Sequence, residues 1–164
     1  MATTISVKID ERGARIIIQG ALNEETDYTP ATHTLSAHAR MVHSVSFDLG
    51  DVNRTNSVGI KNWLMFLEKL PRVPFIFTRI SERIVEQVNM IPNALGSNFK
   101  IERFAAPFYC PKCDEPVSLE FTAATFDQSA LAGQQCPTCA GEIEFDALED
   151  EYLHFLKRKA PAAK

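Results

Sequence analysis

The chain has 164 residues, of which 45% are hydrophobic and 23% charged, and its net charge is -4. This composition is typical of a soluble globular protein, and the length allows one domain with a proper core plus a small appendage. No apolar run approaches the length of a membrane span, and no signal-peptide pattern opens the chain, so we expect a cytoplasmic protein without a membrane partner.

The first elements predicted are a hairpin, a helix and a third strand. Apolar side chains alternate at Ile5, Val7 and Ile9, as in a half-buried strand, and a second strand ends at Gly20 after a tight turn. A helix is predicted from Thr29 to about residue 40, because Thr followed by Pro resembles an N-cap and a first helical position. The third strand covers residues 45–49.

Two further helices and two strands follow. Apolar residues recur at helical spacing over 60–70, and Ser81 is a good N-cap for a helix that reaches Met90. Strands are predicted at 73–77 and 99–104. The order β-β-α-β-α-β-α-β implies crossover connections, and therefore an α/β fold with a largely parallel or mixed sheet.

The rest of the chain reads as a smaller unit. Short strands are predicted at 117–121 and 142–145, a loop at 122–135, and a terminal helix at 147–159 followed by a disordered tail. We therefore predict three parts: a domain at 1–104, a small module at 105–146, and a C-terminal helix with its tail at 147–164.

All four cysteines lie in the small module, in two Cys-Pro-x-Cys pairs: Cys110 with Cys113, and Cys136 with Cys139. A Cys-x2-Cys turn directs two thiolates at one centre, and two such turns complete a tetrahedron. This pattern predicts a structural Zn²⁺ site in a zinc ribbon.

Three other uses of these cysteines are chemically open. Two disulfides would require an oxidising compartment, whereas a cytosolic chain favours a metal. A redox Cys-x2-Cys is expected to open a helix, but the residues after both pairs read as turns. Iron bound as in rubredoxin is the third alternative.

The charge of the small module indicates the kind of partner. Residues 105–146 hold Lys112 against seven acidic residues, whereas residues 1–104 hold twelve basic and eleven acidic ones. Nucleic-acid binding needs cations that meet phosphates. We therefore expect no nucleic-acid partner, and either a protein partner or a purely structural role for the module.

Three short motifs resemble a known family. They are FDLGDV at 47–52, NSVGI at 56–60 before an amphipathic helix, and GALN at 20–23. Together with the element order, they make residues 4–104 similar to the STAS domain of bacterial anti-sigma-factor antagonists. The resemblance implies a STAS-like mixed sheet, with the zinc ribbon outside it.

The resemblance also implies a non-enzymatic switch. In that family a Ser in an Asp-Ser motif is phosphorylated by a partner kinase that is also an anti-sigma factor, and the unphosphorylated form binds the partner. Ser57 matches that position, and Gly59 matches the motif's Gly. Asn56 and Val58 depart from the family's Asp and its Ser or Ala.

The residues themselves give Ser57 a second reading, as the N-cap of the helix that follows. A helix start also stabilises a phosphate, so both roles stay open. Asp48 and Asp51 flank a loop and lack a clear third partner for carboxylate chemistry. We therefore expect a regulatory, protein-binding module in bacterial signalling, for which a second copy of the chain is a further candidate partner. The alternatives are a self-assembling scaffold without a phospho-switch, and a redox module.

Overall fold

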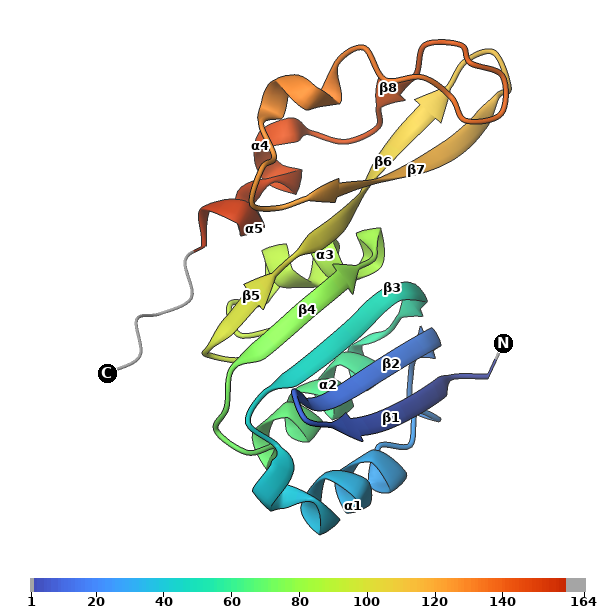
Figure 1. Cartoon of the computed structure of the whole chain (residues 1–164). Coiled ribbons are helices and arrows are strands. Elements are labelled where there is room, and N and C mark those ends of the chain that lie inside the picture. Colours follow the sequence, from blue (N-terminus) through green and yellow to red (C-terminus); the bar gives the residue numbers. More distant parts are fainter. Residues whose placement is uncertain (1, 159–164) are drawn as a thin grey trace.

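The structure is a computed structural model that describes residues 2–158, and these residues form a mixed sheet of eight strands (Figure 1). The strands follow the order β1-β2-β3-β4-β6-β7, with β5 beside β4 and β8 beside β6. Their bounds are β1 (Thr4–Asp10), β2 (Gly13–Leu22), β3 (Val45–Thr55), β4 (Phe75–Ile80), β5 (Phe99–Ile101), β6 (Arg103–Cys110), β7 (Glu115–Thr122) and β8 (Glu144–Phe145). The predicted α/β class is confirmed.

The sheet begins with the predicted hairpin. β1 and β2 are antiparallel, and the pair Asp10 and Gly13 closes a two-residue turn. Gly13 has a φ of 120°, a conformation that side chains rarely adopt, and a Cβ there would lie 2.4 Å from the Ser44 carbonyl oxygen. β2, β3 and β4 are parallel because helices carry the chain between them.

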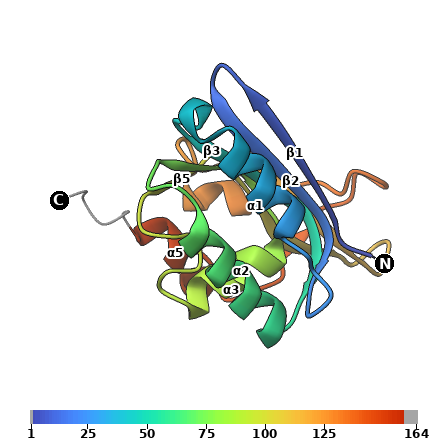
Figure 2. The ribbon, with the colours of Figure 1, turned by 90° about the horizontal axis from the view of Figure 1, so that it is seen from below.

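Three helices cover one face of the sheet: α1 (Thr29–Ala37), α2 (Ser57–Lys69) and α3 (Glu82–Met90) (Figure 2). Beneath α2 lies an aromatic core, in which Trp63 meets Phe47 edge-on at 5.3 Å between ring centroids and Phe47 stacks on Phe77 at 5.0 Å. The Trp63 indole N–H donates to the Ala94 carbonyl at 2.8 Å. No helix formed by residues 2–158 combines the length and apolar character that a membrane span requires.

Strand β6 connects the sheet to the cysteine-bearing segment. At its start Phe104 pairs with Ile80 of β4, and over its length it forms an antiparallel ladder with β7. Beyond the end of β4, its other edge is taken by β8. The predicted boundary after residue 104 therefore falls within one strand, and the division into parts stays a prediction that unfolding experiments must test.

The C-terminal segment returns to helix α3. It forms two short helices, α4 (Glu149–Tyr152) and α5 (His154–Lys157), where one continuous helix is predicted. Asn89 Nδ2 donates to the Tyr152 carbonyl at 2.8 Å, and the Arg158 guanidinium donates to the Val88 carbonyl at 2.7 Å. The predicted helix end at Lys159 and the predicted disordered tail at 160–164 lie outside the described residues.

Several predicted boundaries are wrong because tertiary hydrogen bonds decide them. The strand predicted at 99–104 divides at Glu102, whose N–H donates to the Phe77 carbonyl at 2.8 Å. β3 continues to Thr55, and α1 stops at Ala37 before a 3-10 turn, η1 (Ala39–Met41). The loop predicted at 122–135 contains a second 3-10 turn, η2 (Gln128–Leu131).

Candidate metal centre and the start of helix α2

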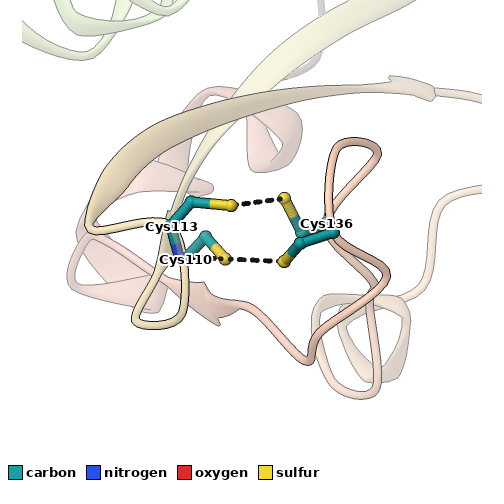
Figure 3. Close-up of side chains that lie close together, drawn as sticks. Cys110, Cys113 and Cys136 are labelled. Atoms are coloured by element: carbon teal, nitrogen blue, oxygen red, sulfur yellow. Dashed lines mark hydrogen bonds between the residues drawn. The ribbon is translucent and has the colours of Figure 1, made fainter.

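The four cysteines converge from two turns on one point. Their Sγ atoms all lie within 4.8 Å of one another. Cys110 Sγ is 3.5 Å from Cys139 Sγ, and Cys113 Sγ is 3.9 Å from Cys136 Sγ (Figure 3). Sulfurs about 2.3 Å from a tetrahedral Zn²⁺ lie about 3.8 Å apart, so the spacing fits a tetrathiolate metal site. The cysteines are free, since a disulfide needs about 2.05 Å between sulfurs.

The two turns have the same backbone geometry. The Asp114 N–H donates to the Cys110 carbonyl at 2.8 Å, and the Ala140 N–H donates to the Cys136 carbonyl at 2.9 Å. The residue after each second cysteine is left-handed, with a φ of 57° at Asp114 and 56° at Ala140. Neither position is a glycine, the residue that adopts this conformation at least cost.

Backbone N–H groups in both turn regions also support the sulfurs. The Cys113 N–H donates to Cys110 Sγ at 3.4 Å, and the Gly141 N–H donates to Cys139 Sγ at 3.4 Å. Such bonds stabilise thiolates, which are the form that binds a metal. The pKa of Cys136 is lowered to about 6 by the backbone N–H groups of Cys139 and Thr138.

The neighbouring sulfurs act in the opposite direction on Cys113. Hydrogen bonds with the Cys139 and Cys110 sulfurs raise the pKa of Cys113 to about 12. Four thiolates so close together repel each other, and a cation at their centre offsets that repulsion. The donor set therefore fits a soft divalent ion held without an open coordination position.

The centre lies against the hydrophobic core rather than on an isolated loop. Cys110 is fully buried and Cys136 is 3% exposed, and both belong to the same cluster of buried side chains as Phe108. Phe108 of β6 meets Phe145 of β8 edge-on at 5.6 Å, which joins the arm carrying the first cysteine pair to the segment that follows the second. Gln135 and Glu142 form an isolated antiparallel bridge around the second turn.

The second candidate site, at the start of α2, is separate from the cysteines. Asn56 is the N-cap: its Oδ1 accepts from the Gly59 N–H at 2.8 Å. The reading of Ser57 as the cap is therefore wrong, because the helix begins at Ser57, one residue earlier than that reading requires. Ser57 is the first helical residue, and its side chain and that of Val58 are exposed.

The neighbours of Ser57 hold this helix start in place. Gly59 is buried, and a Cβ on it would lie 2.0 Å from the Leu22 carbonyl oxygen, so only glycine permits this approach of α2 to β2. The Asn56 amide donates to the Glu24 carboxylate at 2.6 Å. That bond lowers the pKa of Glu24.

A groove of about 430 Å³ begins beside Ser57 and runs between α2 and α3. Its lining is largely aliphatic, and Met65 is 46% exposed. The residues that line it are Ser57, Ile60, Lys61, Leu64, Met65, Glu68, Gln87 and Ile91. The structure thus places Ser57 next to an apolar surface, which the motif alone does not show.

An ion cluster on the helix-free face is absent from the sequence-based predictions. The Arg79 guanidinium lies 3.5 Å from Asp48, 3.3 Å from Asp51 and 3.0 Å from Glu120. The hydrogen bond with Glu120 is the main reason that the pKa of Arg79 is raised. Asp48 and Asp51 thus find their third partner on β4. The signal in the sequence was a single cation in strand 75–80, whose other residues are uncharged.

Gly50 makes room for this cluster. A Cβ on Gly50 would lie 2.6 Å from Arg79 Cζ, so the guanidinium passes directly over the backbone of β3. Because Glu120 belongs to β7 and also pairs with Arg103 at 2.7 Å, the cluster ties the central strands to the hairpin that carries the first cysteine pair. These contacts give the Arg79 ion cluster a structural role.

Comparisons with protein-family models, with curated proteins and with solved structures found no match for this chain. The fold and the cysteine geometry define the class: an α/β protein with a mixed sheet and a four-cysteine cluster within metal-binding distance. The STAS resemblance consequently rests on the motifs and the element order.

Proposed function

We propose that this protein is a non-enzymatic, cytoplasmic regulatory module that docks a signalling protein through the start of α2, and that Zn²⁺ staples its C-terminal part. The domain resembles the STAS antagonists of bacterial anti-sigma factors, whose partners are kinase-like. The observation that carries the proposal is the exposed Ser57 at a helix start, next to a mostly aliphatic groove.

A phosphate on Ser57 would be stabilised by the helix start but would weaken docking of a partner. The N-terminus of α2 carries partial positive charge, which stabilises the added anion. The phosphate would also bring about -1.5 to -2 charges to the edge of an apolar groove. A partner that binds the groove through apolar side chains would then have to desolvate that charge, which weakens docking.

The metal proposal rests on the cysteine geometry. Zn²⁺ is the ion that four thiolates at these distances suit best, and four protein ligands leave no position open for substrate. Both cysteine pairs lie in hairpin-like turns rather than at helix starts, an arrangement that favours a structural metal over a redox dithiol. Bound Zn²⁺ with four thiolates carries about two negative charges, which add to the acidic charge of this module and argue further against a nucleic-acid partner.

The docking proposal is tested with four baits in one pull-down: wild type, Ser57→Ala, Ser57→Glu and Ser36→Glu. Ser36 is an exposed serine on α1, so its variant carries the same added charge at another helix. We expect partners retained by wild type, Ser57→Ala and Ser36→Glu and lost with Ser57→Glu. Identical partner sets for all four baits would contradict docking at this surface.

The metal is tested by mass spectrometry of the native protein and by its absorption spectrum. A colourless protein with one Zn²⁺ per chain is the expected result. Iron colour, or thiols that cycle reversibly between oxidised and reduced forms, would favour the electron-transfer alternative.

A further inference from the structure

Strand β1 leaves the sheet with an unprotected edge. None of the described residues pairs with its outer side, and its seven residues pair with β2 in unbroken register (Figure 1). Edge strands are usually protected by bulges, prolines or several charges. Between Thr4 and Asp10 there is no proline and no bulge, and the only cation is Lys8.

The hairpin geometry identifies the backbone groups that are free. In a two-residue hairpin closed by Asp10 and Gly13, every second residue of β1 bonds to β2. Those residues are Thr4, Ser6, Lys8 and Asp10. The N–H and C=O groups of the intervening Ile5, Val7 and Ile9 therefore point away from the sheet, as a template for another strand.

The side chains next to this edge line a cavity of mixed character, in which Ile5 and Val7 lie beside the polar Thr3, Glu25 and Asp27. Ile5, Val7 and Ile9 are half-buried and pack against the core, and two of them line a cavity of about 360 Å³ between β1 and α1. Pro30, Ala31 and Thr34 form the α1 side of that cavity. A strand added here must have apolar side chains towards α1 and polar ones on the helix-free face.

A second copy of β1 meets both requirements. In an antiparallel pair with Val7 on the two-fold axis, Ile5 faces the partner's Ile9, and all seven residues pair. Lys8 then faces Ser6 and Asp10 faces Thr4 of the other copy, so no like charges are opposed. Parallel pairing in register would instead bring the two Lys8 side chains together.

We propose that this protein forms a symmetric dimer by antiparallel pairing of β1 with β1 of a second copy, with Val7 at the axis. The pairing closes on itself, because a two-fold interface uses the same edge on both copies. A single pair of seven-residue strands is a small interface, so the dimer exchanges with monomer and depends on concentration. This proposal is independent of docking at Ser57.

Sedimentation equilibrium of the full zinc-loaded chain, from low micromolar to near-millimolar concentration, tests the dimer. Val7→Pro removes an outward donor without removing a bond to β2, and edge strands tolerate such a proline. We expect Val7→Pro and Val7→Lys to abolish the dimer, with circular dichroism unchanged. A wild type that stays monomeric throughout, or a dimer that survives both variants, would overturn the proposal.

Charges on the helix-free face test the register. Ser6→Glu would face the partner's Lys8 and should tighten the dimer roughly two- to tenfold, whereas Ser6→Lys should weaken it by a similar factor. Hydrogen exchange at high protein concentration should slow at the amides of Ile5, Val7 and Ile9. Equal effects of the two Ser6 variants, or slowing confined to β7, would refute pairing through β1.

Discussion

The Tyr152 hydroxyl donates a hydrogen bond of 2.7 Å to the carbonyl oxygen of Ala105. This contact joins the C-terminal helix α4 to β6, the strand that ends at Cys110. Phe155 of α5 is also buried and meets Phe104 edge-on at 5.1 Å. The C-terminal segment thus holds the strand that positions the four-cysteine cluster, although it supplies none of the cysteines.

A second buried tyrosine provides a contrast for this bond. Tyr28 stacks on Phe66 at 4.5 Å, but its hydroxyl has no hydrogen-bond partner among the described residues. Tyr152→Phe should lower the free energy of unfolding by about 1 kcal/mol, because the Ala105 carbonyl loses its donor. Tyr28→Phe should leave it unchanged or raise it by about 1 kcal/mol, because it removes an unsatisfied buried group. Urea denaturation measures both, and equal losses would show that Tyr28 has a partner.

Both tyrosines should make the protein sensitive to alkali. Burial raises the pKa of Tyr28 and of Tyr152 above the ordinary value of 10. Between the unfolded and folded pKa values the folded state holds more protons, so its stability falls as pH rises above about 10. Denaturation between pH 9 and 12 should show a shallower decline for each Phe variant than for wild type, and identical slopes would argue against buried, neutral tyrosines.

The left-handed residues of the cysteine turns offer a stabilising substitution. Ala140→Gly should raise stability by roughly 1 kcal/mol, because it relieves a φ of 56° that disfavours a Cβ. Asp114→Gly relieves a φ of 57° as well but loses the contact of Asp114 with the Tyr109 hydroxyl, so it should gain less. Thermal melting of the zinc-loaded protein compares the two, and a loss of stability in Ala140→Gly would contradict the strain.

Removal of the metal should separate the cysteine-bearing module from the sheet. With a strong chelator under mild denaturing stress, amides at 105–146 should exchange rapidly, while those of β2, β3 and β4 stay protected. The reason is that the chelator removes the ion that holds the two cysteine turns together, and the module has little core of its own. Loss of the whole fold in one transition would show that the shared strand β6 makes the two parts inseparable.

The Arg79 cluster should contribute more than an ordinary surface ion pair. Arg79→Ala should cost about 1–2 kcal/mol, because one guanidinium serves three carboxylates and its side chain is only 29% exposed. Arg83→Ala is the matched control and should cost at most about 0.5 kcal/mol. Among the described residues Arg83 forms an ion pair with Glu86 alone, and its side chain is 54% exposed. Equal effects in urea denaturation would show that the cluster adds nothing beyond its pairs.

The sequence alone predicted the main elements and the grouping of the four cysteines, because both depend on local spacing. Alternation at Ile5, Val7 and Ile9 predicts a strand wherever it is placed, and two Cys-x2-Cys turns direct their thiolates at one centre in any context. The predicted order of strands and helices agrees with the observed one as far as α3, whereas the strand predicted at 99–104 and the predicted C-terminal helix are each divided in two. The functional reading of Ser57 stays a prediction, since no observation bears on its modification.

Only the tertiary structure decided which residue caps α2, which carboxylates Arg79 meets and which edge stays open. Asn56 is the cap because Asn56 itself has extended backbone and its side chain reaches the Gly59 N–H, a geometry that no periodicity encodes. Arg79 meets Asp48 and Glu120 across strands far apart in the chain. Strand order likewise decided that β6 belongs both to the sheet and to the cysteine site, and that β1 keeps an unpaired edge. Neither follows from local spacing, because pairing between distant segments is a property of the packed sheet.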